Sequence, residues 1–119
     1  MISFENFTMS DGSPIYLQIL LYIKRGMIAG SICDGDELPS RRVLSALLGV
    51  NPNTVQKAFA LLEEQGLISS RAGAKSVIAV TDEQIAEIKS ELLLSDIRNI
   101  TSALKQMGLT REEAARLIE

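Results

Sequence analysis

The stretch GVNPNTVQKAF, residues 49–59, places a proline between two asparagines and follows them at once with a helical pattern. Asn51 is a good helix N-cap, because its side-chain oxygen can accept a hydrogen bond from the backbone amide of Asn53 or Thr54. Pro52 suits the first helical position, where it leaves no amide unpaired and its φ is already helical. The stretch therefore predicts a helix that begins at Pro52.

One face of this helix is apolar, with the i, i+3, i+4, i+7 spacing of a buried stripe. Its members are Val55, Ala58, Phe59 and Leu62. Gly66 is expected to end the helix. Capping does not explain why Asn53, Gln56 and Lys57, all off the buried face, are amides or cations with no acid among them. The first turns are therefore expected to contact a partner.

A shorter helix is predicted just before this one. Ser40 can cap the segment RRVLSALL, residues 41–48, and Gly49 can supply a left-handed stop. The predicted apolar face consists of Val43, Leu44, Leu47 and Leu48. Two helices joined by a short turn that contains glycine make a candidate helix-turn-helix.

A first helix and a hairpin are predicted on either side of this pair. The helix would start with Ser13 as its cap and Pro14 at its first position, and run to about residue 29. Residues 68–70 and 76–80 read as two strands, because the loop RAGAK between them contains the glycine of a tight turn. Such a ribbon is marginal alone, so it must pack on the helices. Helix-turn-helix plus hairpin is the winged-helix arrangement.

The tail reads as a separate helical segment. TDEQ, residues 81–84, is a capping box that opens a long helix, Gly108 ends it, and TREE opens a last short helix. One apolar stripe steps close to a heptad seam and a second lies beside it. The stripes are Leu93, Ile97, Ile100, Leu104 and Met107, and Ile85, Ile88 and Leu92. They can fold onto the winged helix or meet a second copy of the chain, and we favour the second.

Composition excludes several classes of function. The 119 residues contain no histidine and a single cysteine, so the commonest general base is absent and no intrachain disulfide or cysteine-built metal site is possible. We expect no enzyme, no bound metal and no cofactor. The N-terminus has no secretory pattern and no stretch is apolar for long enough to span a bilayer, so we expect a cytoplasmic protein without a membrane partner.

Charge is distributed unevenly along the chain. The net charge is −3, yet residues 1–80 hold seven basic and seven acidic residues, and the acidic excess lies in residues 81–119. Residues 38–62 and 65–80 hold five cations and no acid. Such local basic patches in an acidic chain are typical of a surface that meets nucleic acid.

Residues 14–68 resemble the DNA-binding domain of GntR-type bacterial transcription regulators. That family carries a P-[IL]-Y-x-Q-[IL] helix, a G-D-x-L-P-S-x-R-x-L-A segment and a G-V-x-x-x-T-V recognition helix. The matching residues here are Pro14, Tyr16, Gln18, Gly35, Asp36, Leu38, Pro39, Ser40, Arg42, Leu44, Gly49, Val50, Thr54 and Val55. The recognition helix and the short two-helix tail are similar to the YtrA subfamily, whose members lack a separate effector domain.

The resemblance implies that Arg42, the start of the recognition helix and the wing tip contact DNA. Amide side chains can pair with adenine in the major groove, while arginine and lysine hold phosphate or guanine. The full set of expected DNA contacts is Ser40, Arg41, Arg42, Asn51, Asn53, Thr54, Gln56, Lys57, Arg71, Gly73 and Lys75. For Ser40 and Asn51 the alternative is a cap only, for Thr54 a bond to backbone, and for Arg41 a position in solvent. Pro52 stands where many family members have arginine, and Lys75 and Val77 also depart from the common wing pattern.

We therefore expect a mainly α-helical chain with a small β-hairpin. Residues 1–12 would form an arm, residues 13–80 a winged helix-turn-helix domain, and residues 81–119 a helical dimerisation segment. The expected function is a transcriptional regulator, a repressor by resemblance, that binds double-stranded DNA with two-fold symmetry as a homodimer. The alternative is a winged helix that binds protein and has no DNA target. The sequence indicates no particular small-molecule effector.

Overall fold

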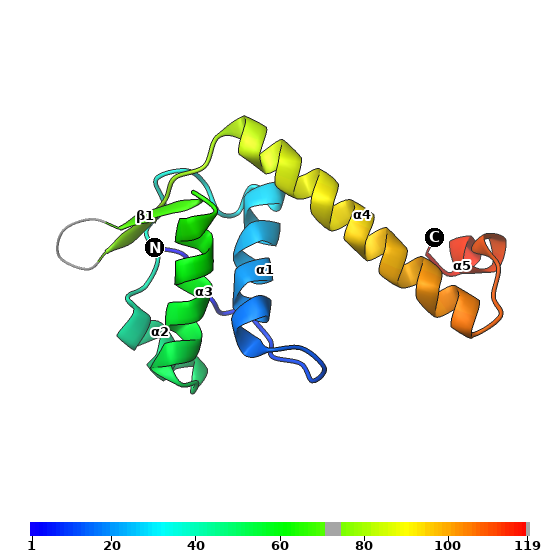
Figure 1. The fold of residues 1–119 in the computed structure, drawn as a ribbon, viewed down its shortest axis with the longest axis horizontal. Coiled ribbons are helices and arrows are strands. Elements are labelled where there is room, and N and C mark those ends of the chain that lie inside the picture. Colours follow the sequence, from blue (N-terminus) through cyan, green and yellow to red (C-terminus); the bar gives the residue numbers. More distant parts are fainter. Residues whose placement is uncertain (71–74, 119) are drawn as a thin grey trace. The chain divides into compact units, whose positions relative to one another are not determined.

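The computed structural model describes residues 1–70 and 75–118. Two units are distinguished by their internal contacts, residues 1–85 and residues 86–119. The prediction of a mainly helical fold with one antiparallel hairpin is confirmed (Figure 1). The elements are α1 (Ile15–Ala29), α2 (Arg41–Leu48), α3 (Pro52–Glu64), β1 (Ile68–Ser70), β2 (Ser76–Ile78), α4 (Asp82–Gln106) and α5 (Arg111–Ile118).

The start of α1 differs from the prediction. Pro14 occupies the N-cap position, no side chain caps it, and the helix begins at Ile15 rather than at Pro14. Ser13 is not a cap: its carbonyl accepts a hydrogen bond from the Gln18 side chain, which also bonds the backbone of Ser10 in both directions. A glutamine in the first turn of α1 therefore organises the start of this helix.

The two helices of the helix-turn-helix begin as the sequence predicts. Ser40 Oγ accepts from the amide of Val43 at 3.1 Å, and Asn51 Oδ1 accepts from the amide of Asn53 at 2.8 Å. Gly49 between the helices has φ +68°, a left-handed conformation that glycine adopts without strain. Both caps are local, which is why residue spacing alone predicts them.

The predicted apolar face of α2 is only partly buried. Leu44 is fully buried, but Val43 is 49 % exposed and Leu47 is 70 % exposed. This helix has eight residues and packs against α3, which covers a narrow strip of its surface. Of the predicted apolar face, Val43 and Leu47 therefore remain largely in contact with solvent.

The hairpin contains a third extended segment that the sequence did not indicate. β1 and β2 pair in register from Ile68 with Ile78 to Ser70 with Ser76. On the other side of β2, residues 35–38 form three backbone hydrogen bonds of 2.8–2.9 Å with residues 76 and 78. Because β2 lies between two partners, all three of its residues are buried. It ends at residue 78, two residues before the predicted end.

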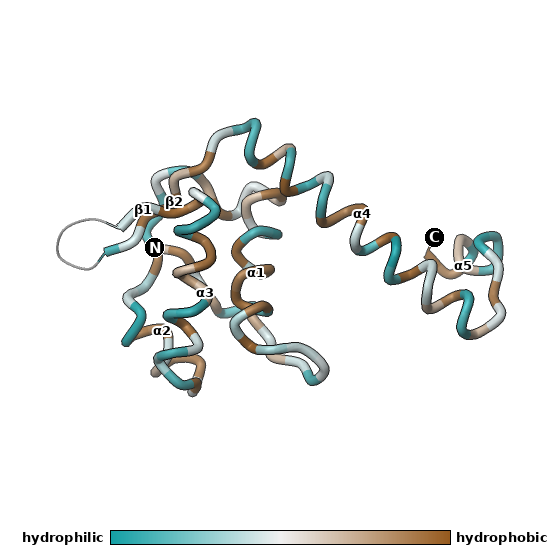
Figure 2. The backbone as a smooth tube through the Cα atoms, in the orientation of Figure 1, coloured by the Kyte–Doolittle hydropathy of each residue, from teal (hydrophilic) through white to brown (hydrophobic). Residues whose placement is uncertain are grey.

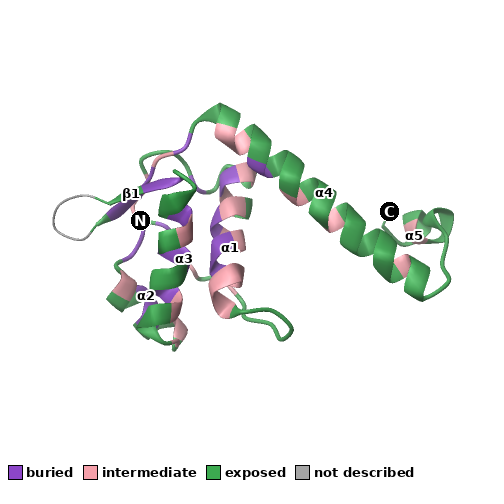
Figure 3. Cartoon of the chain, in the orientation of Figure 1, coloured by how far each residue is buried: buried purple, intermediate pink, exposed green. Residues whose placement is uncertain are grey.

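The core of residues 1–85 lies where α1, α3 and the hairpin meet. α1 and α3 lie side by side, with apolar, buried residues on their facing sides (Figures 2 and 3). The α3 stripe predicted from the sequence is buried, with Val55, Ala58 and Leu62 at 0 % and Phe59 at 1 % exposed. This packing holds the opposite face of α3 toward solvent.

The first residues of the chain lie along α1 and the hairpin. The amide of Ile2 donates to the carbonyl of Glu37 at 2.9 Å, and the Ile2 side chain is buried. Phe4 and Phe7 contact the ring of Tyr22 at centroid distances of 5.0 and 5.4 Å. Burial of aromatic surface therefore holds this segment on α1.

The helices of the tail have the predicted ends. Thr81 and Gln84 form a reciprocal capping box at the start of α4, with bonds of 2.9 and 3.1 Å. Thr110 and Glu113 do the same at α5. Gly108, at φ +68°, closes α4. Within the described part of the chain, none of the helices is long and apolar enough to cross a membrane.

Candidate nucleic-acid interface

The start of α3 presents amide side chains to solvent. Asn53 and Gln56 are exposed, and neither side chain has a hydrogen-bond partner among the described residues. They lie one helical turn apart, opposite the stripe that packs on α1. Asparagine and glutamine can form two hydrogen bonds with the exposed edge of adenine in the major groove, so this face has the chemistry of base readout.

Asn51 and Thr54 also serve the helix itself. The Asn51 side-chain oxygen is occupied by the cap, and the amide of Thr54 donates to the Asn51 carbonyl at 2.9 Å. Thr54 is half-buried. The capping roles proposed for Asn51 and Ser40 are present, and any contact with DNA would be additional.

The two arginines at the start of α2 differ in their surroundings. Arg42 is exposed. Arg41 is half-buried, its guanidinium carbon lies 5.4 Å from the centroid of the Phe59 ring, and its Nε is buried without a hydrogen-bond partner among the described residues. Arg41 therefore lies partly over an aromatic ring of the core, a contact that the sequence did not indicate.

Lys57 also lies over an aromatic ring. Its Nζ is 4.1 Å from the centroid of Tyr16, which belongs to the first turn of α1. Forty-one positions separate the two residues in the chain, so no local pattern could predict the contact. Tyr16 matches the family motif, but it is not among the DNA contacts expected from the sequence.

The described part of the wing contains one of its three expected DNA contacts. Lys75 Nζ lies 3.5 Å from Glu37 Oε2, and the two side chains are 69 % and 45 % exposed. Glu37 was not among the expected site residues. Arg71 and Gly73 lie outside the described residues.

The apolar stripes of the tail are exposed to different degrees. Ile88 is buried, and Ile85, Leu92 and Leu104 are intermediate. The remaining members of the predicted seam are about half or more exposed: Leu93, Ile97, Ile100 and Met107. Leu93, Ile97 and Ile100 form an apolar row along α4, and Met107 continues it just beyond the end of the helix.

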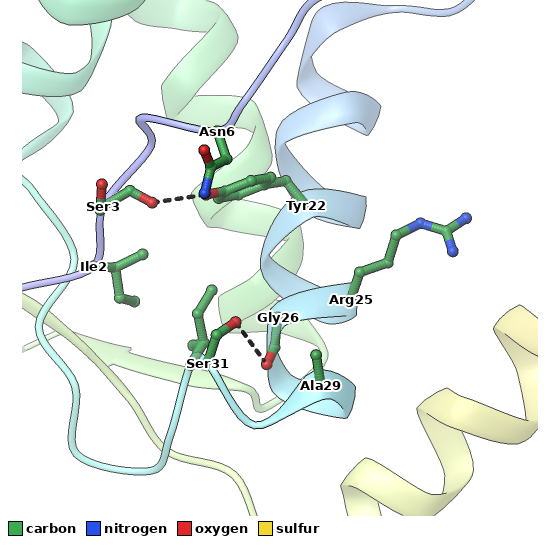
Figure 4. A pocket seen from close by; sticks show the side chains of 9 residues that line it. Ile2, Ser3, Asn6, Tyr22, Arg25, Gly26, Ala29 and Ser31 are labelled. Carbon is green, nitrogen blue, oxygen red and sulfur yellow. Dashed lines mark hydrogen bonds between the residues drawn. The ribbon is translucent and has the colours of Figure 1, made fainter.

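A half-open cavity of about 400 Å³ lies between the first residues of the chain and the second half of α1. Figure 4 shows the hydrogen bond of 2.8 Å from the Tyr22 hydroxyl to the Ser3 carbonyl across it, while the Arg25 side chain points away. Apart from Arg25, the residues that line the cavity are uncharged. The described residues contain no group of three or more side chains that could hold a metal ion.

These features define a class of protein. A short helix leads through a left-handed glycine turn to a second helix with exposed amide side chains, and a hairpin follows. Each of the two helices carries an exposed cation, Arg42 on α2 and Lys57 on α3. This is a winged helix-turn-helix domain of the kind that binds DNA.

Comparison with known proteins identifies the family. Residues 15–78 match the family model described as bacterial regulatory proteins, gntR family. The chain is 35 % identical to the HTH-type transcriptional regulator YhcF of Bacillus subtilis over 87 % of this chain and 85 % of that one. It is also 35 % identical to the HTH-type transcriptional repressor YtrA of the same organism, over 82 % of this chain and 70 % of that one. The chain belongs to the GntR family and is a DNA-binding transcriptional regulator.

Solved structures agree with this assignment. A GntR family transcriptional regulator from Listeria monocytogenes superimposes with a TM-score of 0.77 at 30 % identity, covering 92 % of this chain and 96 % of that one. AraR(DBD) in complex with operator ORX1 superimposes with a TM-score of 0.52 at 28 % identity, covering 60 % and 92 %. The winged helix-turn-helix fold predicted from the sequence is confirmed.

Proposed function

We propose that this regulator is a homodimeric repressor that binds a two-fold symmetric operator in the bacterial cytoplasm. The observation that carries the proposal is the solvent-facing surface of α3, where Asn53, Gln56 and Lys57 are exposed and no acid precedes Glu63. The first turns of such a helix enter the major groove, while the acidic end stays outside it. The similarity to the repressor YtrA supports repression.

Two kinds of contact share this surface. Asn53 and Gln56 read base edges, because their side-chain amide groups are exposed and only the backbone amide of Asn53 takes part in the cap. Arg42 and Lys57 attract phosphate, which fixes the position of the domain on the duplex and carries no sequence information. The proposed interface also includes four residues of the two helix starts and three of the wing: Ser40, Arg41, Asn51, Thr54, Arg71, Gly73 and Lys75.

The row on α4 joins two copies. Three exposed apolar side chains on α4, and one just beyond its end, leave a large apolar surface in water: Leu93, Ile97, Ile100 and Met107. A single winged helix makes few base contacts, and non-specific affinity is typically ~10⁻⁴–10⁻⁶ M. Pairing makes the second binding event intramolecular and raises affinity without new contacts. Two-fold symmetry then requires inverted half-sites about one helical turn, ~10 bp, apart.

Sedimentation of the full chain tests the assembly. Ile97→Glu with Leu104→Glu places two charges in the seam and should give a monomer, because burying an unpaired charge is costly. Ser95→Glu with Ser102→Glu is the matched control. It adds the same two charges, also seven residues apart, on the face of α4 opposite the seam. A dimer for the first variant, or a monomer for the control, would contradict the proposed seam.

Selection from a random DNA pool tests the operator. We expect enriched sites to contain an inverted repeat, and the monomeric variant to bind a half-site weakly. Enrichment of direct repeats or of single sites would contradict a two-fold complex. Failure to enrich any sequence would favour the alternative of a protein-binding winged helix without a specific DNA target.

A further inference from the structure

Tyr16 lies where the first turn of α1 meets the second turn of α3. Its ring is half-buried, and the ammonium of Lys57 lies 4.1 Å from the ring centroid. This is well within the ~6 Å at which a cation is attracted to the negative face of an aromatic ring. The other tyrosine, Tyr22, packs against Phe4 and Phe7, so the two tyrosines serve different parts of the fold.

The contact restricts a side chain that is otherwise flexible. Lysine has four rotatable bonds, and ordering such a side chain at an interface opposes binding. A ring that already holds the ammonium removes part of this entropic cost before DNA arrives. The ring covers one side of the ammonium only, and Lys57 is exposed, so N–H donors remain available to a phosphate oxygen.

The position of the ammonium suits the rest of the surface. Lys57 follows Gln56 directly and lies one turn beyond Asn53, so the lysine borders the two exposed amides. Its aliphatic stem extends toward α1, and the charge is therefore held at the α1 side of α3. A cation fixed at that edge can contact the backbone of the duplex while the amides face the bases.

We infer that Tyr16 is a positioning residue for DNA binding, which holds the Lys57 ammonium beside α3 in the orientation that meets phosphate. The inference rests on the proposed phosphate contact of Lys57. The aromatic ring holds the ammonium, and the tyrosine hydroxyl has no part in this role.

A double-mutant cycle on the full-length chain tests this inference, with a random-sequence duplex as the probe and salt varied from about 50 to 200 mM. The variants are Tyr16→Leu, Tyr16→Phe, Lys57→Met and the double variant Tyr16→Leu/Lys57→Met, with Lys89→Met as the control for loss of one positive charge elsewhere. Thermal unfolding and circular dichroism establish that each variant folds.

Tyr16→Leu should weaken binding about two- to fivefold, or ~0.5–1 kcal/mol, because DNA must then order the free lysine side chain. Tyr16→Phe should bind like the unmodified chain, because it keeps the ring. In the Lys57→Met background, Tyr16→Leu should cause no further loss. A merely structural role of Tyr16 would instead weaken binding equally in both backgrounds, and that result would overturn the inference. Equal losses in Tyr16→Phe and Tyr16→Leu would also overturn it, by assigning the effect to the hydroxyl.

Failure of the underlying proposal gives a different result. If Lys57→Met binds as well as Lys89→Met does, Lys57 has no phosphate contact, and the role of Tyr16 is overturned together with it.

Proton NMR provides a readout that is independent of DNA and of variant stability. The ε-methylene protons of Lys57 should show an upfield ring-current shift in the unmodified chain and in Tyr16→Phe, but not in Tyr16→Leu. An unshifted signal in the unmodified chain would also overturn the inference.

Discussion

Lys75 Nζ lies 3.5 Å from Glu37 Oε2, and the backbone of Glu37 forms an antiparallel bridge with Val77. The third segment of the sheet therefore places a carboxylate beside a cation of the wing. Both side chains are largely exposed, so the pair contributes little to folding. The pair instead affects DNA binding, because Glu37 neutralises the charge of Lys75, which we propose to face phosphate.

Glu37→Gln should raise affinity for random-sequence DNA about two- to threefold at low salt, since it removes a negative charge next to Lys75. The gain should disappear at high salt, where exposed charges are screened. Fluorescence anisotropy at several salt concentrations measures it, with Glu87→Gln on α4 as the control. An equal gain in the control would mean that net charge alone explains the effect.

Asn51→Ala should lower the free energy of unfolding by about 1 kcal/mol, because the amide of Asn53 loses its acceptor. Asn51→Ser should stay close to the unmodified chain, since serine caps as well as asparagine does. Urea denaturation measures both. If Asn51→Ala is as stable as Asn51→Ser, the cap contributes nothing to stability.

Asn53→Ala should leave the free energy of unfolding nearly unchanged, because the side chain is exposed and makes no hydrogen bond within the described residues. Specific DNA binding should weaken by ~1–3 kcal/mol, with relaxed preference at one position in each half-site. Selection of binding sites with the variant checks this, and an unchanged site preference would remove Asn53 from base readout.

Arg42→Gln should weaken binding to all sequences alike and lower the salt slope of log K by about 0.9, because an exposed guanidinium on phosphate displaces a counterion. Arg41→Gln should additionally lower the free energy of unfolding by ~0.5–1 kcal/mol, since Arg41 lies over Phe59. Salt titration and urea denaturation separate the two arginines. A salt slope unaffected by Arg42→Gln would show that this residue does not contact the backbone.

Asp34→Ala should lower the free energy of unfolding by ~1–3 kcal/mol. Asp34 Oδ1 accepts from the amide of Val80 at 2.9 Å, and removing the acceptor leaves a partly buried donor unsatisfied. Asp11→Ala, at an exposed position in the N-terminal segment, is the control and should change stability by less than ~0.5 kcal/mol. Equal stabilities of the two variants would contradict this role of Asp34.

The sequence by itself determined the helix-turn-helix and its caps. Each cap joins residues two or three positions apart, so residue type and spacing are enough to predict it. The pairs are Asn51 with Asn53, Ser40 with Val43, and Thr81 with Gln84. The buried stripe of α3 follows equally from its period, because one face of a helix must leave water. The exposed amides of the candidate interface were predicted as the complement of that stripe.

The tertiary structure alone decided which distant segments of the chain contact one another. Residues 35–38 become a partner of β2, and Asp34 bonds Val80 across forty-six positions. The exposure of Val43 and Leu47 also depends on what packs beside α2, and the apolar pattern of that helix does not indicate it. Lys57 over Tyr16 has the same origin. Such contacts form only when separate elements pack, and the periodicity of one element contains no information about which neighbour will cover it.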